Sequence, residues 1–235
     1  MPPELELIAR LPLFSPLSDS ELREALAHAQ ECHFLKGEFV FQQDEPARHF
    51  FFLLGGHLQI SQLTPAGERV VVRYVCSGEL FGIARAMAMS HFPASAVAVE
   101  DSCALRWPSA QWEPLSRVCT HLTEHVVQAV GKRLQDAHQR IRELSTERVE
   151  QRLTHALLRL AQQFGRSTAT GVSIDFPLSR QNLAEMTGTT LHTVSRLLSA
   201  WKERGLLELG RQHVALLDLD GIARYAEPPE TDHAR

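Results

Sequence analysis

Two kinds of hydrophobic pattern divide the chain. From His33 to about residue 113, short apolar runs alternate with glycine-containing turns, whereas from Pro114 onward apolar residues recur at steps of three and four. Short alternating runs are typical of β-strands, and a three-to-four spacing is typical of one face of an α-helix. The pattern therefore predicts an α+β protein whose β-rich part precedes a helical part.

The β-rich part predicts an antiparallel barrel or jelly roll. Short strands at roughly 8–12-residue spacing with turn residues between them favour this architecture over a parallel sheet. Thr64–Gly67 is expected to be a tight turn, because proline presets φ and glycine accepts a positive φ. Two short helices, Glu4–Leu13 and Ser18–Ala29, are expected before the strands, and Ser18 and Glu21 form a capping-box pair. The strand candidates are Glu38–Gln42, His49–Leu54, His57–Leu63, Glu68–Tyr74 and Ala94–Val99.

A long amphipathic helix is expected over residues 114–146. Thirty helical residues span ~45 Å at ~1.5 Å per residue, which is longer than the predicted barrel. The helix can pack along its own domain, but its length favours a two-stranded coiled-coil seam between the subunits of a homodimer. The apolar stripe comprises Leu115, Val118, Leu122, Val126, Val130, Leu134, Ala137, Ile141 and Leu144.

A separate C-terminal domain is expected after this helix. Arg148–Phe164 reads as a further helix that ends at Gly165, and a polar loop, Ser167–Ser173, and a short strand, Ile174–Pro177, follow it. The domain boundary falls at about Leu144–Glu147. We therefore expect a barrel domain over 1–113, a dimerisation helix over 114–146, a DNA-binding domain over 147–226 and a tail over 227–235.

The stretch from Leu178 to Leu198 predicts a helix-turn-helix. Ser179 can cap a short first helix, Gly188 stands where the turn needs a positive φ, and Thr189 can cap the second helix. The residues expected to face inward are Leu183, Ala184 and Met186 in the first helix and Val194, Leu197, Leu198 and Trp201 in the second.

The outer face of the second helix is polar and suits a DNA major groove. Small polar side chains can contact phosphates there, and Arg196 can reach a guanine edge. After Gly205, the segments Leu206–Leu209 and His213–Leu217 predict a β-hairpin wing, with Arg211 at its tip placed for a phosphate contact. The outward residues are Thr190, His192, Thr193, Ser195, Arg196 and Lys202.

The charge distribution agrees with a DNA-binding C-terminal domain. The net charge is −4, yet residues 148–226 carry ten Lys and Arg against seven Asp and Glu, while residues 1–147 carry thirteen against eighteen. A basic segment in an acidic chain is the expected electrostatic signature of nucleic-acid binding. A module that binds an effector or a protein but has no specific DNA site is the alternative.

Several other classes of protein find no support. No apolar run reaches the ~20 residues that cross a bilayer, and the N-terminus lacks a signal-peptide pattern, so we expect a cytoplasmic protein without a membrane partner. The four cysteines are far apart and are expected to be reduced thiols. No nucleophile elbow, zinc-protease motif or P-loop is present, so we expect no enzymatic activity.

Together these residues resemble the Crp/Fnr superfamily of bacterial transcriptional regulators. The resemblance covers nearly the whole chain: the barrel with Gly78–Gly82, the long helix, and Leu178–Arg196 with the wing. It implies a homodimer that binds double-stranded DNA at a two-fold-symmetric site, changes its domain orientation on sensing a signal, and contacts RNA polymerase. By this resemblance His192, Ser195 and Arg196 read bases, and Ser179, Arg180, Gln181, Thr190 and Thr193 contact the DNA backbone.

Departures from the family pattern narrow the expected signal and site. His192 replaces the glutamate that accepts from cytosine, so the half-site sequence is open. Leu191 stands where cyclic-AMP-reading members have an arginine, so the chain resembles those members less than it resembles the Fnr and Dnr members. Among these, the resemblance is nearest to the nitric-oxide-responsive Dnr/NnrR-like group.

The barrel residues argue against a cyclic nucleotide. Family members hold its phosphate with an Arg-Ser pair, which here reads Ala94-Ser95. Loss of that arginine removes a charge-assisted contact of ~2–3 kcal/mol, and Glu79, left alone, would repel a phosphate. We therefore do not expect cyclic AMP to bind, and we interpret Glu79 and Gly82 as turn and fold residues. The residues expected at the effector pocket are Glu79, Gly82, Ala94 and Ser95.

The remaining cofactor candidates come from the resemblance. Oxygen-sensing Fnr members hold an iron–sulfur cluster with N-terminal cysteines, and none precedes Cys32 here, so we do not expect a cluster. Haem is the suspected sensor in the Dnr/NnrR-like group, and it stays open as a cofactor. His57 and His91 are weak candidates for the iron ligand, and the other reading of each is an ordinary surface histidine.

Overall fold

The computed structural model describes residues 8–227. The chain divides into two compact units. The N-terminal unit comprises residues 1–68 and 72–136, and the C-terminal unit comprises residues 69–71 and 137–235. The chain passes from the first unit to the second within one long helix, α4 (His121–Thr146), and residues 69–71 at the start of β5 (Arg69–Cys76) also group with the second unit.

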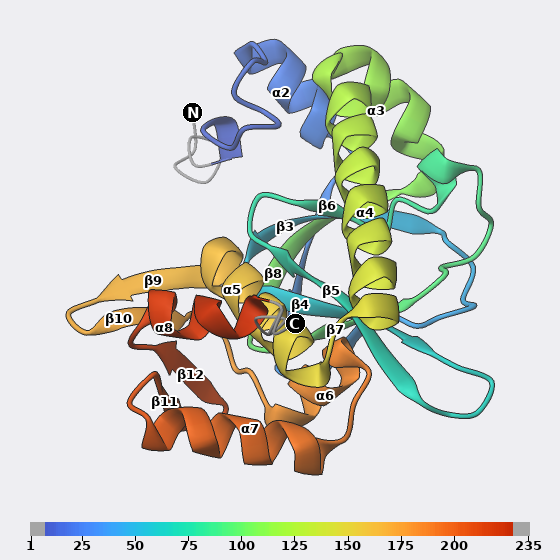
Figure 1. Cartoon of the computed structure of the whole chain (residues 1–235). Helices are drawn as coiled ribbons and strands as arrows, with labels where there is room; N and C mark the ends of the chain where they lie inside the picture. Colours follow the sequence, from blue (N-terminus) through green and yellow to red (C-terminus); the bar gives the residue numbers. More distant parts are fainter. Residues whose placement is uncertain (1–7, 228–235) are drawn as a thin grey trace, which may run out of the picture. The chain divides into compact units, whose positions relative to one another are not determined.

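Two four-stranded sheets form the N-terminal unit (Figure 1). One sheet has the strand order β1-β8-β3-β6 and the other has the order β2-β7-β4-β5, and the pairings within them are antiparallel. The predicted antiparallel jelly-roll architecture is therefore confirmed. The strands are β1 (Gln30–Phe34), β2 (Phe39–Phe41), β3 (His49–Gly55), β4 (His57–Leu63), β5 (Arg69–Cys76), β6 (Leu80–Phe81), β7 (Ser95–Ala98) and β8 (Ser102–Pro108).

All five predicted strands are present, and the sequence pattern missed three others. β1, β6 and β8 were not predicted, because β1 is largely polar and β6 has only two residues. β8 pairs with both β1 and β3 and so depends on partners far away in the chain. The predicted turn is confirmed, since Gly67 has a φ of 82° and its N–H donates to the Thr64 carbonyl at 2.8 Å.

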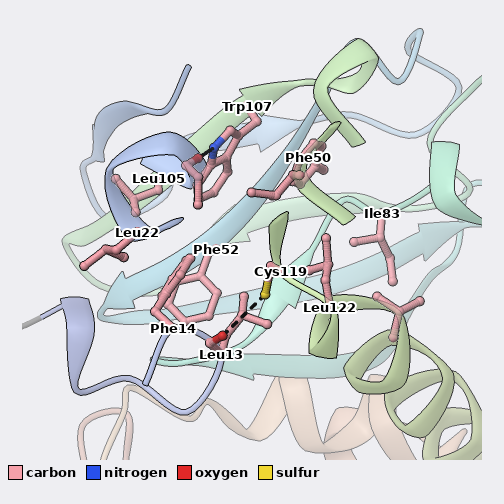
Figure 2. Close-up of a cluster of buried hydrophobic side chains, with 13 residues drawn as sticks. Leu13, Phe14, Leu22, Phe50, Phe52, Ile83, Leu105, Trp107, Cys119 and Leu122 are labelled. Carbon is pink, nitrogen blue, oxygen red and sulfur yellow. Dashed lines mark hydrogen bonds between the residues drawn. The ribbon is translucent and has the colours of Figure 1, made fainter. Parts of the chain in front are cut away.

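Helices cover one of the sheets and enclose a core. α2 (Asp19–Leu26) is capped by Ser18 and Glu21 as predicted. The expected helix Glu4–Leu13 begins outside the described residues, and Ile8 and Ala9 are helical before the chain turns. The Trp107 indole donates to the Ala25 carbonyl at 2.9 Å within this core, which Figure 2 shows. The core includes Leu13, Phe14, Leu22, Phe50, Phe52, Ile83, Leu105, Trp107, Leu115, Cys119 and Leu122.

The predicted single helix over residues 114–146 is two helices. α3 (Trp112–Val118) and α4 (His121–Thr146) are separated at Cys119 and Thr120, where Cys119 leaves helical geometry. The apolar spacing passes through this break unchanged, so periodicity could not reveal it. The first part of the stripe is also not an intersubunit seam, because Leu115, Leu122 and Val126 are buried in the core of their own unit.

The second part of the stripe is exposed along α4. Leu134 and Ile141 each leave more than half of the residue accessible, and Leu144 leaves about half. Val127, which was not part of the predicted stripe, is also more than half exposed. Val130 and Ala137 complete a spacing of alternately three and four residues, the a and d positions of a heptad repeat. Only residues 127–144 therefore leave apolar side chains exposed on α4, and the intersubunit seam stays a prediction.

The described part of the C-terminal unit, up to residue 227, contains the end of α4, four further α-helices and a four-stranded sheet. Its helices after α4 are α5 (Val149–Phe164), α6 (Arg180–Thr187), α7 (Leu191–Glu203) and α8 (Leu219–Ala223). The sheet has the order β11-β12-β10-β9, with β9 (Gly165–Thr168), β10 (Gly171–Ile174), β11 (Leu207–Gly210) and β12 (His213–Leu216). α5 confirms the predicted helix, and β11 with β12 confirms the predicted wing.

Two local predictions in this unit were wrong. The segment expected to be a polar loop, Ser167–Ser173, is largely a hairpin of β9 and β10, whose strands pair from Gly171 with Thr168 to Ile174 with Gly165. The expected strand Ile174–Pro177 is present only at Ile174. Strands of four residues with polar side chains carry too little apolar alternation to be recognised, and pairing with β12 completes them.

Single 3-10 turns connect several of these elements. They are Arg85–Met87, Ser109–Gln111 and Arg224–Ala226. The four cysteines are free thiols, as expected. Among the described residues, no helix combines the length and the apolar character that spanning a membrane requires.

Candidate nucleic-acid interface

Reciprocal hydrogen bonds fix the start of α6. The Ser179 hydroxyl accepts from the Asn182 N–H at 3.0 Å, and the Asn182 side-chain oxygen accepts from the Ser179 N–H at the same distance. Leu183, Ala184 and Thr187 are buried, whereas Met186, predicted to face inward, is only half-buried. The predicted cap is confirmed. Thr187 is buried where Met186 was expected to be, and burial of its hydroxyl is tolerated because the hydroxyl donates to the Leu183 carbonyl at 2.7 Å.

The turn between α6 and α7 has the geometry that its glycine predicts. Gly188 adopts φ 60° and ψ 47°, a conformation that residues with a Cβ rarely take. The cap of α7 is Thr190 and not the predicted Thr189, since the Thr190 hydroxyl accepts from the Thr193 N–H at 3.2 Å. Thr189 instead donates its N–H to the Ala184 carbonyl and so completes the turn.

The inner face of α7 is confirmed residue by residue. Val194, Leu197, Leu198 and Trp201 are buried. The Trp201 indole lies 5.3 Å from the ring of Tyr225, measured between centroids. Because these large apolar groups anchor the helix, its rotation about its own axis is fixed, and the opposite face must point to solvent.

That opposite face presents the three predicted base-reading residues together. His192 and Arg196 are exposed, Ser195 is half-buried, and their spacing of three and four residues places them on one side of α7. Among the described residues, Arg196 has no hydrogen-bond or ion-pair partner. Its guanidinium, with five donors in a planar fork, is available to an external acceptor.

The wing and the start of α6 border one groove. Its volume is about 400 Å³, and the lining includes Ser179, Arg180, Gln181, Leu191, Gly210 and His213. The wing turn is tight, with Gln212 at φ 57°, and the Leu178 N–H donates to the Gln212 carbonyl at 2.9 Å. Arg180 is an exposed part of this lining, and Arg211, also exposed, lies in the wing turn between the lining residues Gly210 and Gln212.

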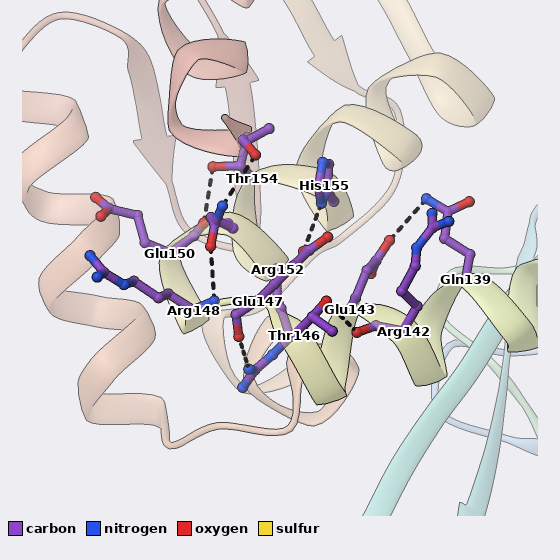
Figure 3. A network of polar contacts seen from close by, with 12 residues as sticks. Gln139, Arg142, Glu143, Thr146, Glu147, Arg148, Glu150, Arg152, Thr154 and His155 are labelled. Carbon is purple, nitrogen blue, oxygen red and sulfur yellow. Dashed lines mark hydrogen bonds and ion pairs between the residues drawn. The ribbon is translucent and has the colours of Figure 1, made fainter. Parts of the chain in front are cut away.

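A polar network supports the helices behind this surface (Figure 3). The Glu143 carboxylate, near the end of α4, pairs with Arg159 of α5 and accepts from Gln139 at 2.9 Å. His155 pairs with Glu147 at 3.0 Å. Arg152 donates to the Thr187 carbonyl at 3.0 Å and so connects α5 to the turn before α7.

The N-terminal unit contains a small cavity that includes two of the predicted effector residues. Its volume is about 80 Å³, below the ~300–1,000 Å³ of typical ligand sites. Gly82 and Ala94 are part of its lining, whereas Ser95 instead accepts from the Gln43 N–H at 2.9 Å. The lining comprises Phe41, Ile60, Arg73, Phe81, Gly82, Ile83, Ala84, Met87, Phe92, Pro93, Ala94 and Arg133.

Two arginines in this lining were missed from the sequence. Burial lowers the pKa of Arg133 to about 10, and the charge of Arg73 adds to this effect. Arg73 pairs with Glu79 at 2.7 Å, so the expectation that Glu79 stands alone was wrong. The sequence could not reveal this pair, because spacing alone does not show which neighbouring strand residue turns toward Glu79.

Neither histidine proposed as an iron ligand lines the cavity. His57 lies at the start of β4, where its Nδ1 is 2.5 Å from a Glu100 carboxylate oxygen. His91 is exposed and its Nδ1 lies 2.9 Å from the Ser90 hydroxyl. Gly82 has a φ of 65°, and a Cβ there would lie 2.9 Å from the Phe51 ring, which agrees with its interpretation as a fold residue.

Two protein-family models match the chain. A cyclic nucleotide-binding domain model matches residues 31–117, and a Crp-like helix-turn-helix domain model matches residues 151–225. The first match begins in β1 and ends in α3, and the second extends from α5 past the wing. The first match therefore falls mainly in the N-terminal unit, and the second falls in the C-terminal unit.

Curated relatives and solved structures match along most of their length. The transcriptional regulatory protein btr of Bordetella pertussis is 26% identical and covers 90% of this chain and 87% of its own length. The cyclic AMP receptor protein of Thermus thermophilus is 29% identical, and the match covers 85% of this chain and 89% of the relative. The structure of FixK2 from Bradyrhizobium japonicum shares the fold, with a TM-score of 0.74 and 21% identity. The superposition covers 85% of this chain and 98% of FixK2.

Proposed function

The chain belongs to the Crp/Fnr family of DNA-binding transcriptional regulators, and from this membership we propose that α7 reads the bases of a two-fold-symmetric DNA site. The observation that carries the proposal is the exposed face of α7, where His192, Ser195 and Arg196 project together. An α-helix fits the major groove, and a bidentate arginine there selects guanine.

The residues around this face supply contacts to the DNA backbone in the proposal. Arg180 and Arg211 provide positive charge at the groove between the wing and α6. The capped starts of α6 and α7 direct backbone N–H groups outward, which suits phosphate oxygens. The other proposed contributors are Ser179, Gln181, Thr189, Thr190 and Thr193.

A two-fold site requires two copies of α7 at a fixed separation, and α4 offers a means of pairing. Its heptad positions from Val127 to Leu144 form an apolar stripe that is exposed except at Val130, which is half-buried against the core of its own unit. Two such stripes packed in parallel would place the two DNA-binding units symmetrically. Homodimerisation through residues 127–144 is therefore part of the proposal, and RNA polymerase is the further partner that regulation requires.

The barrel is proposed to sense a signal other than cyclic AMP. Ala94 offers no donor to a phosphate, and Arg73 is already paired with Glu79. In nitric-oxide or redox sensing through haem, His57 or His91 would bind the iron through Nε2, since the hydrogen bonds of both rings to Glu100 and Ser90 use Nδ1. An absorption spectrum of freshly purified protein tests that part, since a Soret band supports haem and its absence removes it.

Random-site selection tests the DNA-binding proposal. The full chain is incubated with randomised duplexes, and the bound fraction is sequenced after repeated rounds. We expect an inverted repeat whose half-site changes in His192→Glu toward a cytosine-containing sequence, because a carboxylate accepts from the cytosine amino group. If no motif is enriched, the alternative holds, and the protein is an interaction module without a specific DNA site.

A further inference from the structure

Three side chains that could together hold a metal ion lie on the first sheet of the N-terminal unit, and none of them lines the cavity of that unit. Glu31 and His33 belong to β1, and Cys103 belongs to the neighbouring strand β8. Their ligand atoms all lie within 4.8 Å of one another. The sequence did not suggest the group, because 72 positions separate Glu31 from Cys103.

The strand register brings these side chains to one face. His33 lies directly opposite Cys103 in the antiparallel pair, and directly opposed residues project to the same side of a sheet. Glu31 precedes His33 by two positions, so it also projects to that side. Cys32, between them, projects to the opposite side. The backbone pairing of β1 with β8 therefore fixes all three donors before any ion binds.

The two distances from the Glu31 carboxylate to the other donors match those around a tetrahedral zinc ion. The Glu31 Oε1 atom lies 3.3 Å from His33 Nε2 and 3.3 Å from Cys103 Sγ. Bonds of about 2.0–2.3 Å from zinc to oxygen, nitrogen and sulfur place neighbouring tetrahedral donors about 3.3–3.7 Å apart. A small displacement of the side chains would allow one ion to contact all three.

The surroundings of the group leave it accessible to an ion. The side chains of His33 and Glu31 are 75% and 53% exposed. Among the described residues, no arginine or lysine forms an ion pair with Glu31, whereas the other such group, Glu143, Glu147 and His155, contains a carboxylate already neutralised by Arg159. An exposed site also leaves the fourth position open to water.

We propose that Glu31, His33 and Cys103 form a Zn²⁺ site with water as the fourth ligand. A mixed nitrogen, oxygen and sulfur donor set of this kind suits zinc, and the imidazole and thiolate disfavour magnesium and calcium, which prefer oxygen. A bound ion would connect the edge strand β1 to β8 and so stabilise the N-terminal unit in the metal-loaded protein.

Cobalt provides a direct test in the full-length protein. The reduced protein, freed of metal by a chelator, is titrated with Co²⁺ and then with Zn²⁺. We expect one Co²⁺ per chain with a thiolate-to-cobalt charge-transfer band in the near ultraviolet and visible bands of tetrahedral intensity, all displaced by Zn²⁺. Zinc should also raise the thermal unfolding temperature.

Variants separate this site from other thiols and histidines. Cys103→Ser should abolish the charge-transfer band, and His33→Ala should weaken binding by at least ~10–100-fold, the loss that even residues behind a ligand can cause. Cys32→Ser is the matched control and should retain the band, because Cys32 lies on β1 between Glu31 and His33 but projects to the opposite face of the sheet. Circular dichroism verifies that each variant is folded. The proposal is overturned if wild type shows no thiolate band at micromolar Co²⁺, or if Cys103→Ser retains it.

Discussion

Arg159 of α5 forms an ion pair with Glu143, whose carboxylate is almost completely buried near the end of α4. The guanidinium donates to both carboxylate oxygens, and Gln139 donates to one of them. A buried carboxylate is tolerated only when it is paired and hydrogen-bonded in this way. This pair therefore connects α5 to the last turns of α4 within the C-terminal unit.

Removal of Arg159 should destabilise the C-terminal unit. Arg159→Met leaves the Glu143 charge buried and unpaired, and we expect a loss of about 3 kcal/mol in the free energy of unfolding. Urea denaturation followed by circular dichroism measures the loss. Arg166→Met is the matched control, because Arg166 pairs with Asp175 on the surface and such a pair contributes about 0–1 kcal/mol. Equal losses in the two variants would contradict the importance of the buried pair.

The same pair predicts how stability depends on pH. Burial alone would raise the pKa of Glu143, but the hydrogen bonds and charge of Arg159 outweigh it, so the pKa lies below its ordinary value of 4.5. A carboxyl whose pKa is lower in the folded state stabilises it above the ordinary value and loses that contribution as pH falls through the folded-state value. Wild type should therefore lose more stability below pH 4.5 than Glu143→Gln does. Parallel losses in both proteins would refute this.

Charge on the exposed stripe of α4 should separate the subunits. Leu134→Glu combined with Ile141→Glu places two carboxylates at core positions of the proposed coiled coil, and we expect a monomer by light scattering and weak DNA binding. Gln135→Glu, one residue away and off the stripe, should remain dimeric. Val126→Glu should instead lower the stability of the N-terminal unit itself, since Val126 is buried there. A dimeric double variant would exclude residues 127–144 as the interface.

Cyclic AMP should not bind the purified protein. The cavity has a volume of about 80 Å³, Ala94 offers no donor, and the Arg73 charge is neutralised by Glu79. Isothermal titration calorimetry should show no saturable heat at micromolar to millimolar nucleotide. Saturable micromolar binding would mean that the cavity opens and that Arg133 or Arg73 binds the phosphate in place of the arginine that family members use.

Arg196 and Arg180 should fail in different ways. Arg196→Ala should cost ~1–3 kcal/mol on the selected site and remove discrimination at one base position in each half-site, because its fork contacts a base edge. Arg180→Ala should weaken binding to all sequences alike and reduce the salt dependence by ~1 phosphate contact per subunit. Fluorescence anisotropy on matched and mismatched duplexes at several salt concentrations measures both effects. The assignment of α7 as the reading helix fails if Arg196→Ala retains full discrimination.

The local pattern of the sequence was sufficient for the DNA-binding surface. The inward residues of α7, the positive φ of Gly188 and the Ser179 cap depend on neighbours within four residues, so helical periodicity and capping chemistry predicted them. The same local signals mistook Thr189 for the cap in place of Thr190, because adjacent threonines have equal capping chemistry and only the backbone geometry distinguishes them.

Tertiary structure alone decided the features that depend on distant partners. β8 exists because it pairs with β1 and β3, the end of the Pro114–Leu144 stripe facing the barrel is buried because a core lies beside it, and Glu79 is neutralised because Arg73 turns toward it. The sequence by itself determined the helices α5, α6 and α7 of the C-terminal unit, five strands of the N-terminal unit and which face of α7 is polar. Which strands pair, which apolar positions are buried and which charges meet was settled only by folding, because these energies arise between residues far apart in the chain.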